Sequence, residues 1–198
     1  MDFPVPPDEC KRRNELRRAN GGRYVPEKVI DRMAKRYPLR DWKPVTPKFR
    51  LDIEPVTGIG SENAYIWDID GTVAHMTGRS PYDYSRVGED AEDVYVRALH
   101  WGICDGIPDA KHLFVSGRNE ECRDVTQHWL AAMGFRVDAL LMRKAGDTRD
   151  DAVVKLEIFN EHIRDRYTVL GVFDDRDRVV SMWRRLNLKC FQVQPGDF

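Results

Sequence analysis

Long apolar runs, net charge and an export signal are all missing from this sequence. No apolar run approaches the ~20 residues that a membrane-spanning helix needs, and the acidic, proline-rich start MDFPVPPDEC does not resemble a signal peptide. The formal net charge is only −1, so any binding of nucleic acid has to use a local basic patch. These features predict a cytosolic protein that is neither exported nor anchored in a membrane.

Metal-binding and disulfide patterns are missing as well. The cysteines are scattered, with no CxxC pair, at Cys10, Cys104, Cys122 and Cys190. Such usage is typical of reduced thiols in the cytosol and argues against a disulfide framework or a zinc knuckle. The histidines are His75, His100, His112, His128 and His162. They lack ligand spacing such as HExxH, so we expect ordinary polar or packing residues, of which His75 could approach a substrate.

The first 50 residues differ in pattern from the rest. They contain two short helical patterns, CKRRNELRR and PEKVIDRMAKRY, followed by a proline-spaced stretch that is typical of a linker. The basic run from Lys11 to Arg18 could contact phosphates, although a solvated helix face is the more common use of such a run. We therefore expect an N-terminal helical segment with its linker over residues 1–50 and one larger domain over residues 51–198.

In the larger domain, short apolar runs alternate with helical patterns. The predicted strands cover residues 64–69, 112–116, 137–142, 167–173 and 189–193. The predicted helices cover residues 89–101, 121–133, 150–166 and 177–186. Apolar strands that alternate with helices are typical of a parallel sheet covered on both faces. The predicted fold is therefore α/β, a three-layer, Rossmann-like parallel sheet with a short N-terminal helical extension.

Polar residues follow three of the predicted strands, where parallel sheets bind their ligands. The strands end in Asp68-Ile69-Asp70-Gly71-Thr72, in Ser116-Gly117-Arg118 and in Asp174-Asp175-Arg176. Lys155 lies one helical turn after Asp151, on the helix before the last of these strands. Each group has an ordinary explanation, such as a turn, a helix cap or a solvated lysine. Their coincidence at one edge of the sheet favours a functional site.

The spacing of the first two carboxylates also points to chemistry. Residues i and i+2 of an extended chain project to the same side, so Asp68 and Asp70 lie in each other's electrostatic field. This arrangement costs free energy unless a cation or a reaction uses the two carboxylates. A simple Asp-Gly turn at the end of the strand remains the alternative.

The four groups together resemble the haloacid dehalogenase superfamily, which consists mostly of Mg²⁺-dependent phosphotransferases with the same fold. Within it, DIDGTVAHMTGRSPYD, GDTRDDAVVKLEIF, FDDRDRVVSMWRRL and QPGDF are similar to the 3′-phosphatase domain of phage polynucleotide kinase–phosphatases. The resemblance covers roughly residues 64–198 and continues more weakly into residues 1–50, which are similar to the last helices of that enzyme's kinase domain. A kinase also needs a GxxxxGK[ST] loop, and the absence of any Gly-Lys dipeptide excludes 5′-kinase activity for this chain.

The resemblance implies a role for each residue. Asp68 would be the nucleophile that forms an aspartyl-phosphate, and Asp70 the general acid and base. The ligands of Mg²⁺ would be Asp68, the main-chain oxygen of Asp70, and Asp175 with or without Asp174; the sequence does not decide which of these two aspartates binds the metal directly. Asp151 would order the site and Lys155 would neutralise the intermediate. The residues that would hold the phosphate are Thr72, Arg79, Ser116, Gly117 and Arg118; without the resemblance, Arg79 would be read as a surface residue.

The segment between Thr72 and Ser116 is too short for a large cap, so only a minimal cap is expected over the site. An open site suits the end of a polymer, and Tyr82 and Tyr84 could stack on a terminal base, although loop tyrosines are more often surface residues. The favoured function is removal of 3′-phosphate from RNA or DNA ends. A phosphatase of small molecules such as mononucleotides and a non-catalytic docking module are the alternatives.

The sequence leaves several points open. These are RNA against DNA, activity on 2′,3′-cyclic phosphate ends, and the oligomeric state. A kinase module or a ligase of the same repair pathway is the expected partner, and the cytosol would be that of the host cell if a phage encodes the chain.

Overall fold

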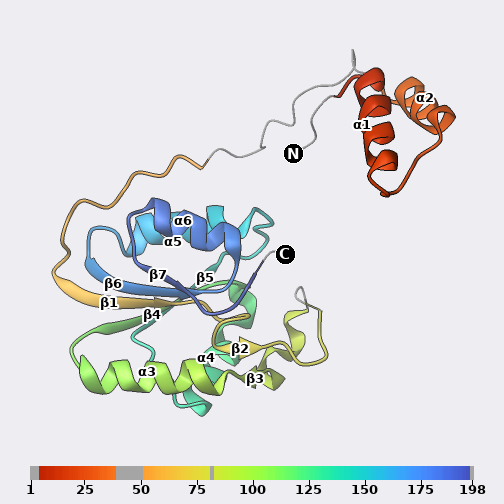
Figure 1. Ribbon diagram of the computed structural model, residues 1–198. Helices are drawn as coiled ribbons and strands as arrows, with labels where there is room; N and C mark the ends of the chain where they lie inside the picture. The colour runs from red at the N-terminus through yellow and green to blue at the C-terminus, as the bar shows by residue number, and fades with distance from the viewer. Residues whose placement is uncertain (1–4, 39–50, 81–82, 197–198) are drawn as a thin grey trace. The chain divides into compact units, whose positions relative to one another are not determined.

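A computed structural model describes residues 5–38, 51–80 and 83–196 of the chain (Figure 1). It divides into two compact units, Met1–Arg50 and Leu51–Phe198. Among the described residues, no helix has the length and apolar character that crossing a membrane requires. All four cysteines are free thiols.

The first unit is a pair of helices, α1 (Pro7–Ala19) and α2 (Glu27–Arg36). Asn14 of α1 is buried, and it holds the segment before α2: its side-chain amide donates to the carbonyl oxygen of Val25 at 2.7 Å and its side-chain oxygen accepts from the Val25 amide at 2.9 Å. Lys11 pairs with Asp31 across the two helices at 2.7 Å. The predicted linker lies outside the described residues from residue 39 to residue 50.

The second unit is built around a parallel five-stranded sheet with the order β5-β4-β1-β6-β7. The strands are β1 (Glu62–Trp67), β4 (Lys111–Asn119), β5 (Ala139–Arg143), β6 (Tyr167–Asp174) and β7 (Cys190–Gln192). Helices α5 (Asp151–His162) and α6 (Asp177–Arg185) cover one face, while α3 (Val94–Gly106) and α4 (Arg123–Ala132) lie on the other (Figure 1). The predicted three-layer α/β fold is thereby confirmed.

A small hairpin and two short helices complete this unit. The hairpin pairs β2 (Ala74–His75) with β3 (Ala91–Glu92), and the 3₁₀ helices are η2 (Tyr84–Glu89) and η3 (Glu120–Cys122). The predicted start of a helix at residue 89 was wrong. Helix α3 begins at Val94 because the Asp93 side chain accepts from the amides of Tyr95 and Val96, each at 2.9 Å, and so caps the helix.

Two apolar cores hold the sheet between its helices. Val179, Val180, Trp183 and Leu186, which recur at helical spacing along α6 and its C-terminal end, are all buried in the first core. In the second core, Trp67 and Phe173 stack with their ring centroids 4.1 Å apart. Burial of each such side chain contributes about 1.5–3 kcal/mol. The two cores thus fix the strands between the helix layers. Val125 of α4 has an apolar side chain at helical spacing from the buried Trp129, but it is 48% exposed.

Candidate active site

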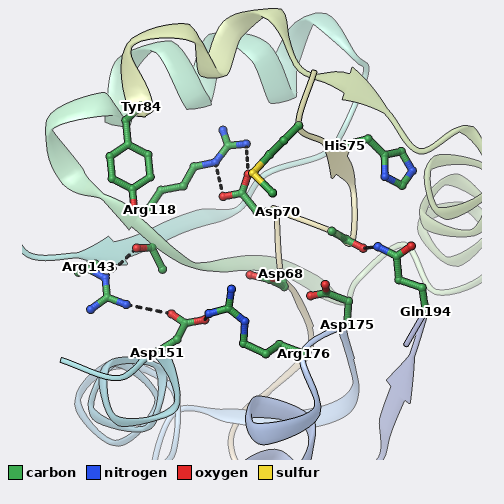
Figure 2. Close-up of a pocket in the computed structure, with 13 residues that line it drawn as sticks. Asp68, Asp70, His75, Tyr84, Arg118, Arg143, Asp151, Asp175, Arg176 and Gln194 are labelled. Atoms are coloured by element: carbon green, nitrogen blue, oxygen red, sulfur yellow. Dashed lines mark hydrogen bonds and ion pairs between the residues drawn. The ribbon is translucent and has the colours of Figure 1, made fainter. Parts of the chain in front are cut away.

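A hollow of about 360 Å³ lies at the carboxyl ends of β1, β4 and β6. Among the predicted residues, its lining contains Asp68, Asp70, Gly117, Arg118, Asp151 and Asp175 (Figure 2). The parallel sheet brings these residues together because each lies near or just after the carboxyl end of a strand, or begins the helix α5.

Asp68 follows β1 directly and is almost fully buried. The Lys155 ammonium donates to Asp68 Oδ1 at 2.6 Å and to Asp174 Oδ2 at 2.9 Å, and lies 3.7 Å from Asp151 Oδ2. Burial raises the pKa of Asp68 well above its ordinary value; the charges of Asp174 and Asp175 raise it further, while Lys155 opposes the rise. One ammonium therefore does not balance the negative charge that gathers here.

The carboxylate cluster fits a hard cation. Oxygens of Asp68, Asp174 and Asp175, all buried, lie within 4.8 Å of one another. Within the described part of the chain, Asp175 Oδ2 is buried without a hydrogen-bond partner. Burial and the charge of Asp174 raise the pKa of Asp175 to about 6. An all-oxygen donor set with an unpaired buried carboxylate oxygen matches the ligands that Mg²⁺ prefers.

Asp174 and Asp175 are used differently. Asp174 Oδ2 accepts from Lys155 and, at 3.2 Å, from Trp183 Nε1, while Oδ1 accepts from the Arg176 amide at 3.2 Å. Both of its oxygens are thus engaged in holding the site, whereas an oxygen of Asp175 is available. Gly71 has a φ of +85°, and a Cβ atom there would overlap the Asp175 carboxylate, so this close approach requires glycine.

Two arginines hold Asp70. Arg118 donates from Nε to Asp70 Oδ2 and from Nη2 to Oδ1, both at 2.8 Å, and Arg79 Nη2 donates to Oδ1 at 2.8 Å. Burial opposes ionisation, but the hydrogen bonds and charge of Arg118, together with Arg79, keep the pKa of Asp70 below its ordinary value. Asp70 is therefore held as a carboxylate as long as both arginines contact it.

Asp90 is a site residue that the sequence did not indicate. Its side chain has no exposed surface, and it accepts from Arg79 Nε at 2.8 Å, from Arg79 Nη2 at 2.6 Å and from Arg118 Nη2 at 2.7 Å. The Asp90 carboxylate thus orients both guanidinium groups toward Asp70. The two arginines carry two positive charges, of which Asp70 balances one and Asp90 the other. No motif marks it, because it lies 20 residues beyond Asp70 in a stretch whose helical pattern suggested a different structure.

The remaining predicted phosphate ligands lie behind the lining of the hollow. Thr72 and Ser116 are buried, and Ser116 Oγ accepts from the Arg118 amide at 3.2 Å. The Arg79 side chain has no exposed surface and faces Asp70 and Asp90. Its placement favours holding Asp70 over direct contact with phosphate, and the phosphate-binding roles of these residues stay predictions.

Arg143 and Arg176 also line the hollow, although no role was predicted for either from the sequence. Arg143 ends β5 and donates from Nε to the Gly117 carbonyl at 2.7 Å and from Nη2 to Asp151 Oδ1 at 3.2 Å. Arg176 Nη1 lies 3.7 Å from Asp151 Oδ2. Arg143 follows the predicted strand over residues 137–142 directly, and this position at a strand end is the signal in the sequence that could have identified it.

Aromatic and polar side chains complete the lining. His75, Tyr84 and Gln194 all border the hollow, and His75 Nε2 lies 2.9 Å from Asp93 Oδ2. Tyr82, the second predicted stacking residue, lies outside the described residues. The lining is therefore mostly charged, with one aromatic face from Tyr84.

The fold and the carboxylate site define a phosphatase of the haloacid dehalogenase class. The phosphatase domain of polynucleotide kinase PNKP is the family that matches residues 62–198, and the chain belongs to this family.

A curated relative supports the assignment to this family. The chain is 40% identical over 129 residues to a protein of Autographa californica nuclear polyhedrosis virus, described as a bifunctional polynucleotide kinase/RNA ligase. The match covers 63% of this chain and 18% of that protein.

Two solved structures are also similar. A chain in the Pnkp1/Rnl/Hen1 RNA repair complex has a TM-score of 0.68 and 32% identity, with 99% of this chain and 65% of that chain covered. A chain in a further Pnkp1/Rnl/Hen1 complex has a TM-score of 0.68 and 35% identity, with 80% and 55% covered. This chain thus spans less than two thirds of each relative.

Proposed function

We propose that this chain is a Mg²⁺-dependent polynucleotide 3′-phosphatase that acts on RNA or DNA ends through an aspartyl-phosphate intermediate. The observation that carries the proposal is the buried set of Asp68, Lys155 and Asp174, at hydrogen-bond distances of 2.6 and 2.9 Å, beside an unpaired oxygen of Asp175. The arrangement supports the proposal because it would bring a nucleophile, a fixed cation and a metal ligand together at one point of the sheet edge.

Several groups have to act together in this reaction. Enzymes accelerate hydrolysis of phosphate monoesters by up to ~10²¹, and a general acid contributes only about 10²–10⁴ of this. Lys155 holds Asp68 through Oδ1, so we assign attack on phosphorus to Oδ2. The same ammonium remains beside the aspartyl-phosphate and offsets its charge.

Asp70 would transfer the protons in both steps of the reaction, the formation and the hydrolysis of the aspartyl-phosphate. An incoming phosphate competes with Asp70 for the guanidinium of Arg118, which lines the hollow. Weakening this contact raises the proton affinity of Asp70, because the contact favours the carboxylate. Asp70 can then protonate the departing sugar oxygen, and it later takes a proton from the water that cleaves the intermediate.

The metal would be held by Asp68, Asp175 and the main-chain oxygen of Asp70, with Asp174 holding Lys155 beside them. When bound, Mg²⁺ supplies positive charge that lets an anionic carboxylate approach an anionic phosphate.

The short segment over the hollow and the family of the chain favour a nucleic-acid end as substrate. A polynucleotide kinase or ligase module would act with it, in the pattern that the descriptions of its relatives suggest. A cytosolic location, a homo-oligomer and activity on 2′,3′-cyclic phosphate ends are further predictions of this proposal.

The direct test compares kcat/KM for a 3′-phosphorylated oligonucleotide and for the matching nucleoside 3′-monophosphate. We expect the oligonucleotide to be preferred at least tenfold, which corresponds to ~1.4 kcal/mol of additional transition-state binding. Equal values would favour the small-molecule phosphatase, and no turnover of either would favour a docking module. RNA and DNA oligonucleotides with 3′-phosphate or 2′,3′-cyclic ends resolve the finer specificity.

Arg79→Ala is expected to lower kcat/KM on 3′-phosphorylated oligonucleotides by roughly ten- to a hundred-fold. The change removes charge-assisted hydrogen bonds to Asp70 and Asp90, each worth about 1.5–3 kcal/mol, and ~1.4 kcal/mol is a factor of ten in rate. Arg79→Lys should rescue activity only in part, since an ammonium keeps the charge but loses the planar fork.

Arg86→Ala is the matched control for this change. Arg86 belongs to the same segment but is 49% exposed and pairs with Glu89, so its loss should leave kcat/KM near the wild-type value. Thermal unfolding separates lost folding from lost catalysis. An Arg79→Ala enzyme with wild-type kcat/KM would contradict the assigned role.

A further inference from the structure

The C-terminal segment, residues 192–196, runs along the loop that follows β6. At one end of the segment, Gln192 Nε2 donates to the main-chain oxygen of Asp175 at 2.8 Å. At the other end, the Gly196 carbonyl accepts from the Asp177 amide at 3.0 Å. A Cβ atom at Gly196 would overlap the main chain of Asp175, so the two segments are in direct contact. Both ends of the C-terminal segment are therefore fixed against the loop that carries Asp175.

Between these two ends, Gln194 reaches the loop that follows β1. Its side chain borders the hollow, and its Nε2 atom donates to the carbonyl oxygen of Gly71 (Figure 2). Because a carbonyl oxygen can only accept, the side-chain amide of Gln194 is held with its NH₂ group toward Gly71. Gly71 directly follows Asp70. Gln194 thus connects the loop that carries Asp70 to the segment that is fixed beside Asp175.

The connection falls on a residue whose backbone turns easily. Gly71 has a φ of +85°, and a Cβ atom there would overlap the Asp175 carboxylate, so a side chain is excluded. Glycine, however, has the largest conformational freedom of all residues. The Gly71 amide donates to the Ala74 carbonyl at 2.8 Å and so holds the peptide group that contains the Asp70 carbonyl. Gln194 holds the peptide group on the other side of Gly71, and the two hydrogen bonds together restrain the turn.

We propose that Gln194 is a positioning residue for the divalent metal, because it fixes the main-chain oxygen of Asp70 relative to the Asp175 carboxylate. The inference rests on the proposed function, in which these two oxygens bind Mg²⁺. Magnesium requires nearly octahedral geometry with ligands at about 2.0–2.1 Å, so a turn that moves freely weakens binding. Groups that hold metal ligands in place typically contribute about 10- to 100-fold to metal affinity.

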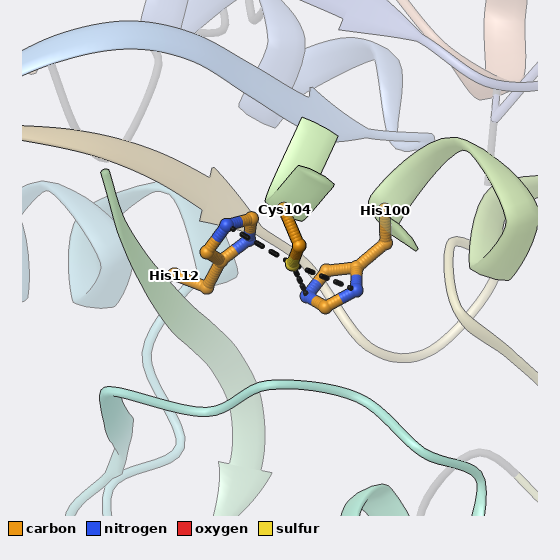
Figure 3. Close-up of side chains that lie close together, drawn as sticks. All are labelled: His100, Cys104 and His112. Carbon is orange, nitrogen blue, oxygen red and sulfur yellow. Dashed lines mark hydrogen bonds between the residues drawn. The ribbon is translucent and has the colours of Figure 1, made fainter. Parts of the chain in front are cut away.

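The cluster of His100, Cys104 and His112, between α3 and β4, does not fit such an ion (Figure 3). Trp67 Nε1 donates to His112 Nδ1 at 3.2 Å, so the proton of the neutral ring lies on Nε2, which is 3.3 Å from Cys104 Sγ. Burial lowers the pKa of both histidines to about 4, so both rings are neutral at pH 7. Mg²⁺ and Mn²⁺ also prefer oxygen ligands to sulfur and imidazole. Among the described residues, the binding of these ions therefore reports on the carboxylate cluster.

The test measures Mn²⁺ binding to the whole chain by electron paramagnetic resonance of the free ion, with Mg²⁺ as the competitor. We expect Gln194→Met to weaken Mn²⁺ binding by roughly tenfold or more, because methionine has a similar length and volume but cannot donate to the Gly71 carbonyl. Gln127→Met makes the same chemical change at an exposed position of α4 and should bind Mn²⁺ like the wild type. Circular dichroism and the Tm of the metal-free protein verify that each variant is folded.

The Mg²⁺ concentration for half-maximal activity should rise by a similar factor in Gln194→Met. The KM for a 3′-phosphorylated oligonucleotide at saturating Mg²⁺ should stay near the wild-type value. A glutamine with only a structural role would lower Tm and leave the Mg²⁺ requirement unchanged, and a glutamine that contacts the substrate would raise KM. Either of these results would overturn the proposal.

The binding measurement also separates this inference from the proposed function. A wild-type chain that does not bind Mn²⁺ would refute the magnesium site and the role of Gln194 with it. Equal Mn²⁺ affinity of the wild type and Gln194→Met would overturn only the role of Gln194, and the carboxylate site would stand.

Discussion

Asp68→Asn is expected to abolish turnover of 3′-phosphorylated ends while the protein stays folded. An amide cannot form an aspartyl-phosphate, so the covalent route is closed and kcat should fall by at least roughly 10³-fold. Folding should survive because the amide has nearly the same shape and Lys155 keeps its contact with Asp174 at 2.9 Å. Removal of a carboxylate whose ionisation burial disfavours also relieves repulsion from Asp174 and Asp175.

The measurement is kcat under saturating substrate, with a trap for phosphoenzyme in wild type and variant. Asp165→Asn is the control, since this aspartate is exposed and lies just before the start of β6, at the opposite edge of the sheet from the site, and it should retain activity. Turnover above a tenth of wild type in Asp68→Asn would rule out the covalent mechanism. Thermal unfolding of the variant tests whether activity is lost only because the protein no longer folds.

Exhaustive treatment with EDTA is expected to remove activity, and added Mg²⁺ to restore it. Metal ions stabilise the transition state by several kcal/mol, so the loss should be on the order of 10³-fold. Asp175→Asn should resemble the metal-free enzyme and need much higher Mg²⁺, because it changes the carboxylate with an unpaired buried oxygen.

Asp174→Asn separates the two neighbouring aspartates. It should weaken the hold on Lys155, which Asp174 contacts directly, and so lower kcat with a smaller change in the Mg²⁺ requirement. Restoration by Mg²⁺ rather than Zn²⁺ would assign the effect to the carboxylate cluster. Full activity after metal removal, with no metal found by elemental analysis, would refute the proposed magnesium site.

The sequence alone determined the fold and the main carboxylates. Apolar strands alternating with helices define a parallel sheet, and such a sheet places the ends of distant strands at one edge. Asp68, Asp70 and Asp175 could be predicted together for this reason, without knowledge of any side-chain position. Gly71 belongs to the same local pattern, since its positive φ serves the turn directly after Asp70.

Only the tertiary structure decided which buried charged side chains contact one another. Asp90 contacts Arg79 and Arg118, which are 11 residues before it and 28 residues after it in the chain, and no periodic pattern connects such positions. The different uses of Asp174 and Asp175 depend on Lys155 and Trp183, which arrive from two separate helices. His100, Cys104 and His112 likewise meet only because α3 packs against β4. Periodicity and strand order are local properties that a sequence carries, whereas the pairing of buried charges depends on side-chain directions that exist only after the chain has folded.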